Sequence, residues 1–283
     1  ESLLSSIFKF CKLICFFTYI TSTFRFYLYI YKNPIMKDWF YPENLRESEL
    51  KHRNSNNDSP HTGGDFGSYK SLLKTNDLEN SMIKSHNDIN PAQKLKLLKK
   101  ITDKVLKNKK IHSILNVGCG TGFETKVLSE IYNCDITGVD ASLDGIEYAK
   151  KYNSNSKTEY ISKTIDSNFL LNTKFDICYA IEFYPFTRTK DLEFQKNIIS
   201  SIFNNLSNEG VLVMYQLETD ESDTIKNNIQ ELSVLLKKNV KTYSKFHHSI
   251  YKFIPNYFFT KLYCLVLEKI LNRDIGRQLI IFY

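Results

Sequence analysis

Three closely spaced glycines follow a short run of strand-forming apolar residues near the middle of the chain. Residues 114–117 read I-L-N-V, and Gly118, Gly120 and Gly122 follow at alternate positions. A buried strand that ends in such a turn lets a ligand approach bare backbone, because glycine has no Cβ and tolerates a positive φ. Residues 114–125 therefore predict a nucleotide-type binding site at the end of a first parallel strand.

A carboxylate stands where such a site would use one. Residues 135–140 read D-I-T-G-V-D and predict a second strand, which ends at Asp140, 22 positions after Gly118. In Rossmann-type sites an acidic residue about 20 positions after the first glycine accepts hydrogen bonds from ribose hydroxyls. We expect Asp140 to bind an adenosine ribose and to disfavour a 2′-phosphate. The alternative is a strand-end carboxylate that only caps the next helix.

The glycine spacing separates two classes of cofactor. Dinucleotide folds use G-x-G-x-x-G, whereas this chain has G-x-G-x-G, with a phenylalanine in place of the third glycine. Asn116, Gly118, Gly120 and Gly122 resemble the first motif of the class I S-adenosylmethionine (SAM) dependent methyltransferases, although Asn116 departs from the usual Asp or Glu. The text G-V-D-A-S at 138–142 is also similar to this family. A chance Gly-rich loop and a nicotinamide or flavin domain are the alternatives.

The resemblance implies SAM as the cofactor and a set of residues that hold it. It places the adenine beside Ile165 and Asp166, which follow a third predicted strand at 159–161. The complete set of expected cofactor-binding residues is Asn116, Gly118, Cys119, Gly120, Gly122, Asp140, Ala141, Ile165, Asp166 and Ile181.

Candidate catalytic residues follow the fourth predicted strand, at 175–181, where open α/β sheets bind their ligands. Methyl transfer requires an acceptor held close to the methyl group, and a hydroxyl acceptor also needs a base that removes its proton. Glu182 and Tyr184 are candidates at this strand end, and the adjacent His247 and His248 are candidates nearer the C-terminus. The structural alternative for each is a residue that only shapes the site.

An α/β fold is needed to bring these residues together. Strand-like and helical patterns alternate from residue 91 onward and predict a Rossmann-like, doubly wound, seven-stranded and mostly parallel sheet. The last strand is expected to insert antiparallel at the edge. The predicted strands are 111–117, 135–140, 159–161, 175–181, 211–217, 240–246 and 276–283, and the predicted helices are 91–105, 123–131, 142–152, 189–206 and one around 232–236, with a turn at 207–210.

Two further segments precede the domain predicted for 91–283, which carries a variable aromatic insertion at about 247–271. Residues 1–31 form an apolar, aromatic appendage: a packed helix, a helix in the membrane interface, or a span, which Arg25 disfavours. Residues 32–90 are a linker or lid, in which the resemblance suggests Phe66, Tyr69 and His86 as lid residues.

Charge and cysteine usage restrict the expected binding partners, metals and cellular location. The net charge is +7; residues 1–110 carry 19 basic and 11 acidic residues (19 − 11 = +8), and residues 111–283 carry 19 and 20 (19 − 20 = −1). The basic excess lies in the N-terminal part, and no known motif indicates nucleic-acid binding. The 6 cysteines show no zinc spacing, so we expect no metal and a reducing, cytoplasmic location, with membrane contact through residues 3–31 left open.

The sequence thus predicts a SAM-dependent methyltransferase that modifies O or N of a small-molecule or saccharide-type acceptor. A NAD-dependent Rossmann oxidoreductase is one alternative. A non-catalytic, membrane-associated protein that retains the methyltransferase fold is the other. The oligomeric state is left open.

Overall fold

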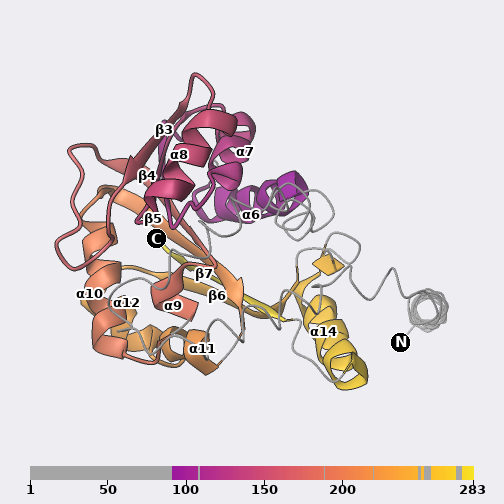
Figure 1. Ribbon diagram of the computed structural model, residues 1–283. Coiled ribbons are helices and arrows are strands. Elements are labelled where there is room, and N and C mark those ends of the chain that lie inside the picture. Colours follow the sequence, from indigo (N-terminus) through magenta and orange to yellow (C-terminus); the bar gives the residue numbers. More distant parts are fainter. Residues whose placement is uncertain are drawn as a thin grey trace, which may run out of the picture. The chain divides into compact units, whose positions relative to one another are not determined.

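Seven strands form one sheet in the part of the chain that the computed structural model describes, which is 91–283 without 108, 188, 219, 248–249, 252–255 and 272–275 (Figure 1). Predictions for residues 1–90, including the lid residues, lie outside this part. The strands are β1 Ser113–Val117, β2 Asp135–Asp140, β3 Thr158–Ser162, β4 Phe175–Ile181, β5 Leu206–Leu217, β6 Val240–Phe246 and β7 Arg277–Phe282. The helices are α6 Pro91–Val105, α7 Phe123–Tyr132, α8 Leu143–Tyr152, α9 Tyr184–Thr187, α10 Leu192–Phe203, α11 Asp220–Asn227, α12 Ile229–Leu236 and α14 Tyr257–Leu271.

The sheet has the order β3-β2-β1-β4-β5-β7-β6. Strands β1 to β5 pair in parallel, and β7 pairs antiparallel with both β5 and β6. The mostly parallel sheet with an antiparallel last strand is therefore confirmed. The predicted position of that strand at the edge is wrong, because β7 lies between β5 and β6. The residues explain this: Gln278–Phe282 are all buried, as an interior strand requires, whereas β6 leaves Lys241 exposed and forms the edge.

Both faces of the sheet are covered, so its central strands are apolar on both sides. One face carries Leu212, Met214 and Ile280 in a core that includes residues of α10 to α12. The other face carries Val213 and Ile281 in a core that includes residues of α6 and α7. Figure 1 shows these two helical layers on either side of the sheet. This arrangement is the doubly wound architecture predicted from the sequence.

Helix α6 begins and ends where the periodicity predicted. Its residues Leu95, Leu98 and Ile101 are buried in the same core as Val127 and Leu128 of α7. Spacings of three and four residues place these side chains on one face, which packs on the domain while the lysines remain outside.

The region between β4 and β5 differs from the prediction. The helix predicted for 189–206 is shorter in the structure, as α10, and the separate helix α9 precedes it. Asp191 caps α10 by accepting a hydrogen bond from Phe194 N at 2.9 Å. The turn predicted at 207–210 lies within β5, which begins at Leu206 because that residue pairs with Phe175. A register shift after Phe175 absorbs the extra length of β5.

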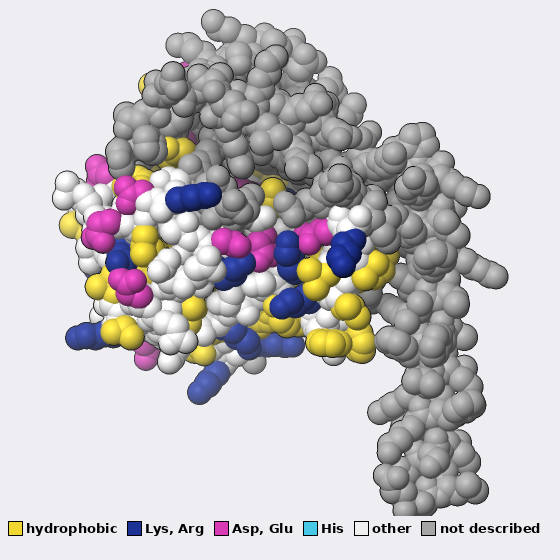
Figure 2. Space-filling view, turned by 90° about the horizontal axis from the view of Figure 1, so that it is seen from below, with side chains coloured by type: hydrophobic (Ala, Val, Ile, Leu, Met, Phe, Trp, Pro, Cys, Tyr) yellow, Lys and Arg dark blue, Asp and Glu magenta, His cyan; other side chains and the backbone are white. Residues whose placement is uncertain are grey.

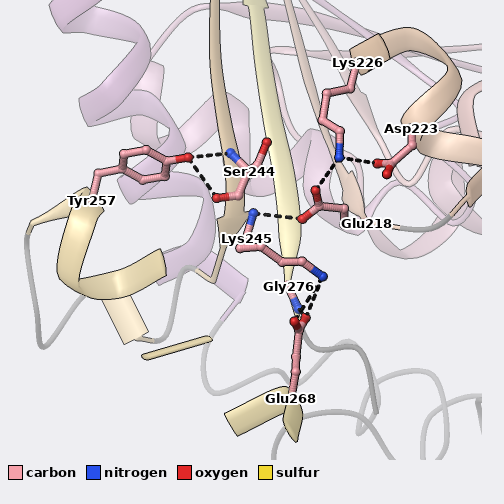
Figure 3. A network of polar contacts seen from close by, with 8 residues as sticks. All are labelled: Glu218, Asp223, Lys226, Ser244, Lys245, Tyr257, Glu268 and Gly276. Carbon is pink, nitrogen blue, oxygen red and sulfur yellow. Dashed lines mark hydrogen bonds and ion pairs between the residues drawn. The ribbon is translucent and has the colours of Figure 1, made fainter. Parts of the chain in front are cut away.

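Strand β6 contains an irregularity that polar side chains stabilise (Figure 3). Lys245 has a φ of 51°, and two backbone amides leave the ladder at this point. Ser244 N donates to Tyr257 Oη at 2.8 Å, and Lys245 N donates to Glu218 Oε2 at 2.8 Å. The other oxygen of Glu218 accepts from Lys226 Nζ at 2.6 Å. The buried carboxylate of Glu218 therefore joins the end of β5 to β6 and α11.

The described residues offer neither a membrane-span candidate nor a metal-site candidate. None of their helices combines the length and apolarity that a membrane span requires. No group of three or more His, Cys, Asp or Glu residues among them is placed to hold a metal ion.

Candidate active site

The glycine turn follows β1 in the middle of the sheet, between β2 and β4. Gly118 N and Cys119 N both donate to Val139 O, at 2.8 and 3.1 Å, so β2 holds the start of the turn. Gly118, Gly120 and Gly122 have φ values of 68°, 52° and 79°, in the left-handed region that favours glycine. The tight turn predicted from the spacing is confirmed.

Two of these glycines are also required by their neighbours. A Cβ on Gly118 would lie 2.6 Å from the Phe183 ring, which follows β4, and a Cβ on Gly122 would lie 2.6 Å from Ala149 Cβ and 2.7 Å from the Tyr160 ring. The Tyr160 hydroxyl is also 3.0 Å from Gly122 O. Residues of α8 and β3 thus pack against Gly122, and the Phe183 ring packs against the backbone of Gly118.

Asn116 has a buried partner on the helix that follows the turn. Its Nδ2 donates to Thr125 Oγ1 at 2.9 Å, and both side chains are buried. An aspartate could only accept this bond, so the Thr125 hydroxyl would have to reverse its direction. With asparagine in place of the usual acidic residue, the side chain at 116 still links β1 to α7 beside the turn. Its contact with a cofactor stays a prediction.

Asp140 lies at the end of β2 and faces the turn. Its Oδ2 accepts from Gly120 N at 2.9 Å and its Oδ1 accepts from Ser142 N at 2.8 Å. Burial raises the pKa of Asp140, and these two hydrogen bonds oppose the rise. Helix α8 is capped by Ser142, whose hydroxyl accepts from Gly145 N at 3.1 Å, and not by Asp140. Ser142 is therefore the N-cap of α8, and the binding role of Asp140 stays a prediction.

The carboxylate of Asp140 retains capacity for a ligand. An ionised carboxyl group offers about four acceptor positions, and each oxygen here uses one for a backbone amide. Each oxygen can therefore accept a further hydrogen bond, which suits the two hydroxyl groups of a ribose. This chemistry fits an adenosine-containing cofactor.

Cys119 supplies backbone to the turn and no reactive thiol. Burial raises the pKa of Cys119 well above its ordinary value, and the charge of Asp140 adds to this shift. The thiol stays protonated at neutral pH and is a weak nucleophile.

The other predicted cofactor residues lie at the ends of adjacent strands. Ile165 is buried after β3, and Asp166 is exposed in a turn where its Oδ1 accepts from Asn168 N at 2.8 Å. Ala141 follows β2, and buried Ile181 ends β4 beside β1. Because β1 to β4 are parallel, their carboxyl ends share one edge, and all ten predicted residues lie along it.

Glu182 is held by two other strands. It follows β4 with a φ of 50°, and its Oε1 accepts from Leu217 N at 3.0 Å and pairs with the guanidinium of Arg277. Arg277 also lies over the Tyr215 ring, with 5.5 Å between its Cζ and the ring centroid. The sequence prediction missed Arg277. The signal was available, because an antiparallel last strand must begin at the edge where parallel strands end.

The remaining catalytic candidates do not converge on Glu182 as a group. Tyr184 opens α9 directly after β4, whereas His247 is buried after β6. Strands β5 and β7 separate β4 from β6, and three strand spacings amount to about 14 Å. Glu182 and His247 therefore follow strands that are not neighbours in the sheet. His248 lies outside the described residues.

A Rossmann-like sheet with a glycine turn after β1 and an acidic residue after β2 defines a class of nucleotide-cofactor enzymes. Comparison with protein families narrows this class: a family described as "Methyltransferase domain" matches residues 108–261, which is more than half of the 283 residues. The chain belongs to this family of SAM-dependent methyltransferases, and its cofactor is SAM.

Individual relatives are more distant. The sterol 24-C-methyltransferase of Candida albicans is 30% identical over 115 residues, which is 39% of this chain and 29% of that protein. The chain therefore spans less than a third of the length of this curated relative. The plantazolicin methyltransferase BamL, solved with a triazolic desmethylPZN analog and SAH, has a TM-score of 0.50 at 15% identity, covering 83% of this chain and 98% of that one.

A second solved structure gives the same result. The TehB-like SAM-dependent methyltransferase from Corynebacterium glutamicum has a TM-score of 0.50 at 14% identity, covering 77% of this chain and 98% of that one. At such identities the likeness shows the shared fold.

Proposed function

We propose that this methyltransferase binds SAM at the carboxyl ends of β1 to β4 and transfers its methyl group to O or N of a small-molecule or saccharide-type acceptor. The observation that carries the proposal is Asp140, which faces the glycine turn and retains one acceptor position on each oxygen. A carboxylate in this position binds a ribose diol and repels a 2′-phosphate.

Each group of residues has a role in this proposal. Asp140 accepts hydrogen bonds from the ribose, and Ile165 and Asp166 contact the adenine. The glycine turn at 118–122 takes the methionine end. Bound there, SAM supplies a methyl group on a positively charged sulfur that an acceptor lone pair can displace, leaving S-adenosylhomocysteine.

The acceptor is placed by the neighbouring strand ends. The Glu182 carboxylate already receives hydrogen bonds from Leu217 N and Arg277, which favours a role in orienting an acceptor over removal of its proton. Tyr184 and His247 remain candidates for contact with the acceptor. Positioning alone supplies much of the rate of such a displacement.

A sterol-type acceptor is the second candidate. It is supported by the similarity to the sterol 24-C-methyltransferase of Candida albicans, which covers 39% of this chain. Methylation would then form a bond to carbon and not to O or N.

We also propose a cytoplasmic location, because Cys119, Cys134, Cys178 and Cys264 are all free and buried, as is common in a reducing compartment.

An acceptor panel distinguishes these candidates. The full chain is incubated with SAM and, separately, with saccharides, small alcohols, small amines and sterols, and both S-adenosylhomocysteine and the methylated product are measured. We expect a methylated oxygen or nitrogen product. A methylated sterol carbon would replace the first candidate by the second, and cofactor binding without turnover of any class would argue against both.

A further inference from the structure

The outer face of helix α14 is exposed and apolar, although a helix that packs on a domain needs apolar residues only on its inner face. Five of its large apolar residues are 39–68% exposed: Phe258, Phe259, Leu262, Leu265 and Val266. Its other side is buried through Thr260, Cys264 and Leu267. A helix that packs on a domain usually has a polar outer face. Helix α14 is apolar on both faces.

The exposed residues form a stripe that carries positive charge. Positions 258, 262, 265 and 266 recur at helical spacing, so they share one side of α14. The exposed charged residues of the helix are Lys261 and Lys269. Its one acidic residue, Glu268, is bound to Lys245 Nζ at 3.0 Å and to Gly276 N at 2.9 Å. Figure 2 shows hydrophobic side chains interspersed with Lys and Arg on the side of the molecule where α14 lies.

Polar contacts fix this face in its orientation (Figure 3). At the beginning of α14 the Tyr257 hydroxyl accepts from Ser244 N at 2.8 Å and donates to Ser244 O at 2.9 Å. Near its end Glu268 is held by Lys245 and by the backbone that precedes β7. The helix is attached to β6 at both ends, so its apolar stripe is held outward.

Charge argues against two of the possible occupants of this stripe. Segment 3–31 is apolar, but it contains Lys9, Lys12 and Arg25 and no acidic residue, so packing it on α14 would oppose like charges. A second copy related by a twofold axis would likewise place lysines near lysines. An anionic bilayer accepts both features, with apolar side chains at the acyl boundary and lysines at the headgroups.

We infer that α14 is a membrane-docking helix, which lies in the interface of an anionic bilayer with its Phe258–Val266 stripe turned toward the acyl chains. The inference does not depend on the acceptor or on the site at β1 to β4. It predicts a defined orientation in which α14 faces lipid and α12 does not; Figure 1 shows the two helices well apart, α12 at the left and α14 at the right.

Fluorescence quenching by brominated lipids tests this orientation. Trp39 is the only tryptophan, so W39F gives a silent background into which Phe258→Trp or, as a matched control, Val234→Trp of α12 is introduced; Phe258 is 68% and Val234 78% exposed. The vesicles contain phosphatidylcholine and phosphatidylserine, with or without bromine on the acyl chains. We expect bromine to reduce the fluorescence of the Phe258→Trp variant by about half or more and to leave the control unchanged.

Three results would overturn the inference. These are no binding to the vesicles, binding without quenching at position 258, and equal quenching at both positions, which would indicate attachment through another segment such as 3–31.

The lysines provide a second measurement. Lys261→Gln with Lys269→Gln is expected to lower the vesicle partition coefficient by about tenfold when phosphatidylserine is present, since each lysine near the surface contributes to binding. Lys100→Gln with Lys104→Gln on α6, both exposed, is the charge-matched control. An equal loss from both pairs would show general attraction without docking of α14 and would contradict the inference.

Discussion

Replacement of Asp140 with alanine is expected to weaken SAM binding by at least about tenfold, because the ribose loses a charged acceptor. The carboxylate also holds Gly120 N at 2.9 Å and Ser142 N at 2.8 Å, so the variant loses order in the turn as well as the ribose contact. Isothermal titration of the purified full chain with SAM measures the affinity, and thermal unfolding checks that the variant is folded.

A neighbouring acid provides the control for this prediction. Asp144 lies in the first turn of α8, close in sequence to Asp140, and Asp144→Ala should leave the affinity unchanged. Asp140→Asn keeps the shape and part of the acceptor capacity, so its loss should be intermediate. If Asp140→Ala binds SAM as tightly as the unmodified chain, the assignment of Asp140 to the ribose is wrong.

Glu218→Gln is expected to lower the free energy of unfolding by about 3 kcal/mol, because it breaks a buried ion pair without changing side-chain shape. The glutamine cannot accept from both Lys226 Nζ and Lys245 N, which now meet one carboxylate at 2.6 and 2.8 Å. The side chain of Glu218 is only 6% exposed, so water cannot replace the lost bonds. For a domain of this size the melting temperature should fall by roughly 6–10 °C.

Glu209 is the matched residue for this comparison. It also pairs with one lysine, Lys109, at 2.6 Å, but its side chain is 78% exposed. Glu209→Gln should leave the free energy of unfolding almost unchanged, as is usual for surface pairs. Urea unfolding of both variants measures the difference. Equal effects of the two substitutions would show that burial of the Glu218 network does not stabilise the fold.

Local sequence patterns predicted the strands that surround the site. The bounds 135–140, 175–181 and 240–246 agree with the structure, because each run is strongly strand-forming and ends at a clear break. The glycine turn was equally clear, since alternate glycines after a buried strand leave few other conformations. Because β1 and β2 are parallel, Asp140 and Gly120 lie at the same edge of the sheet.

Long-range pairing determined what local patterns missed. The start of β5 at Leu206 depends on its partner Phe175, and the interior place of β7 depends on burial on both faces. The pair of Glu182 and Arg277 joins residues that are 95 positions apart. Such contacts depend on strand order, which helical or strand periodicity does not encode.

The two halves of the candidate site were predictable to different degrees. The ten predicted cofactor residues lie at one edge of the sheet because they end or follow adjacent parallel strands. The catalytic candidates came from two distant regions, and the sheet order places His247 two strands beyond the neighbours of Glu182. The outward face of α14 was not predictable either, because a helix that is apolar on both sides gives no sign of which side packs on β6.

Calorimetric titration of the full chain with SAM and, separately, with NAD tests whether the glycine turn and Asp140 form a SAM site. The site described here predicts saturable binding of SAM, competition by S-adenosylhomocysteine, and no binding of NAD. Binding of NAD in the absence of SAM binding would contradict the account and would favour an oxidoreductase built on the same glycine turn and strand-end carboxylate.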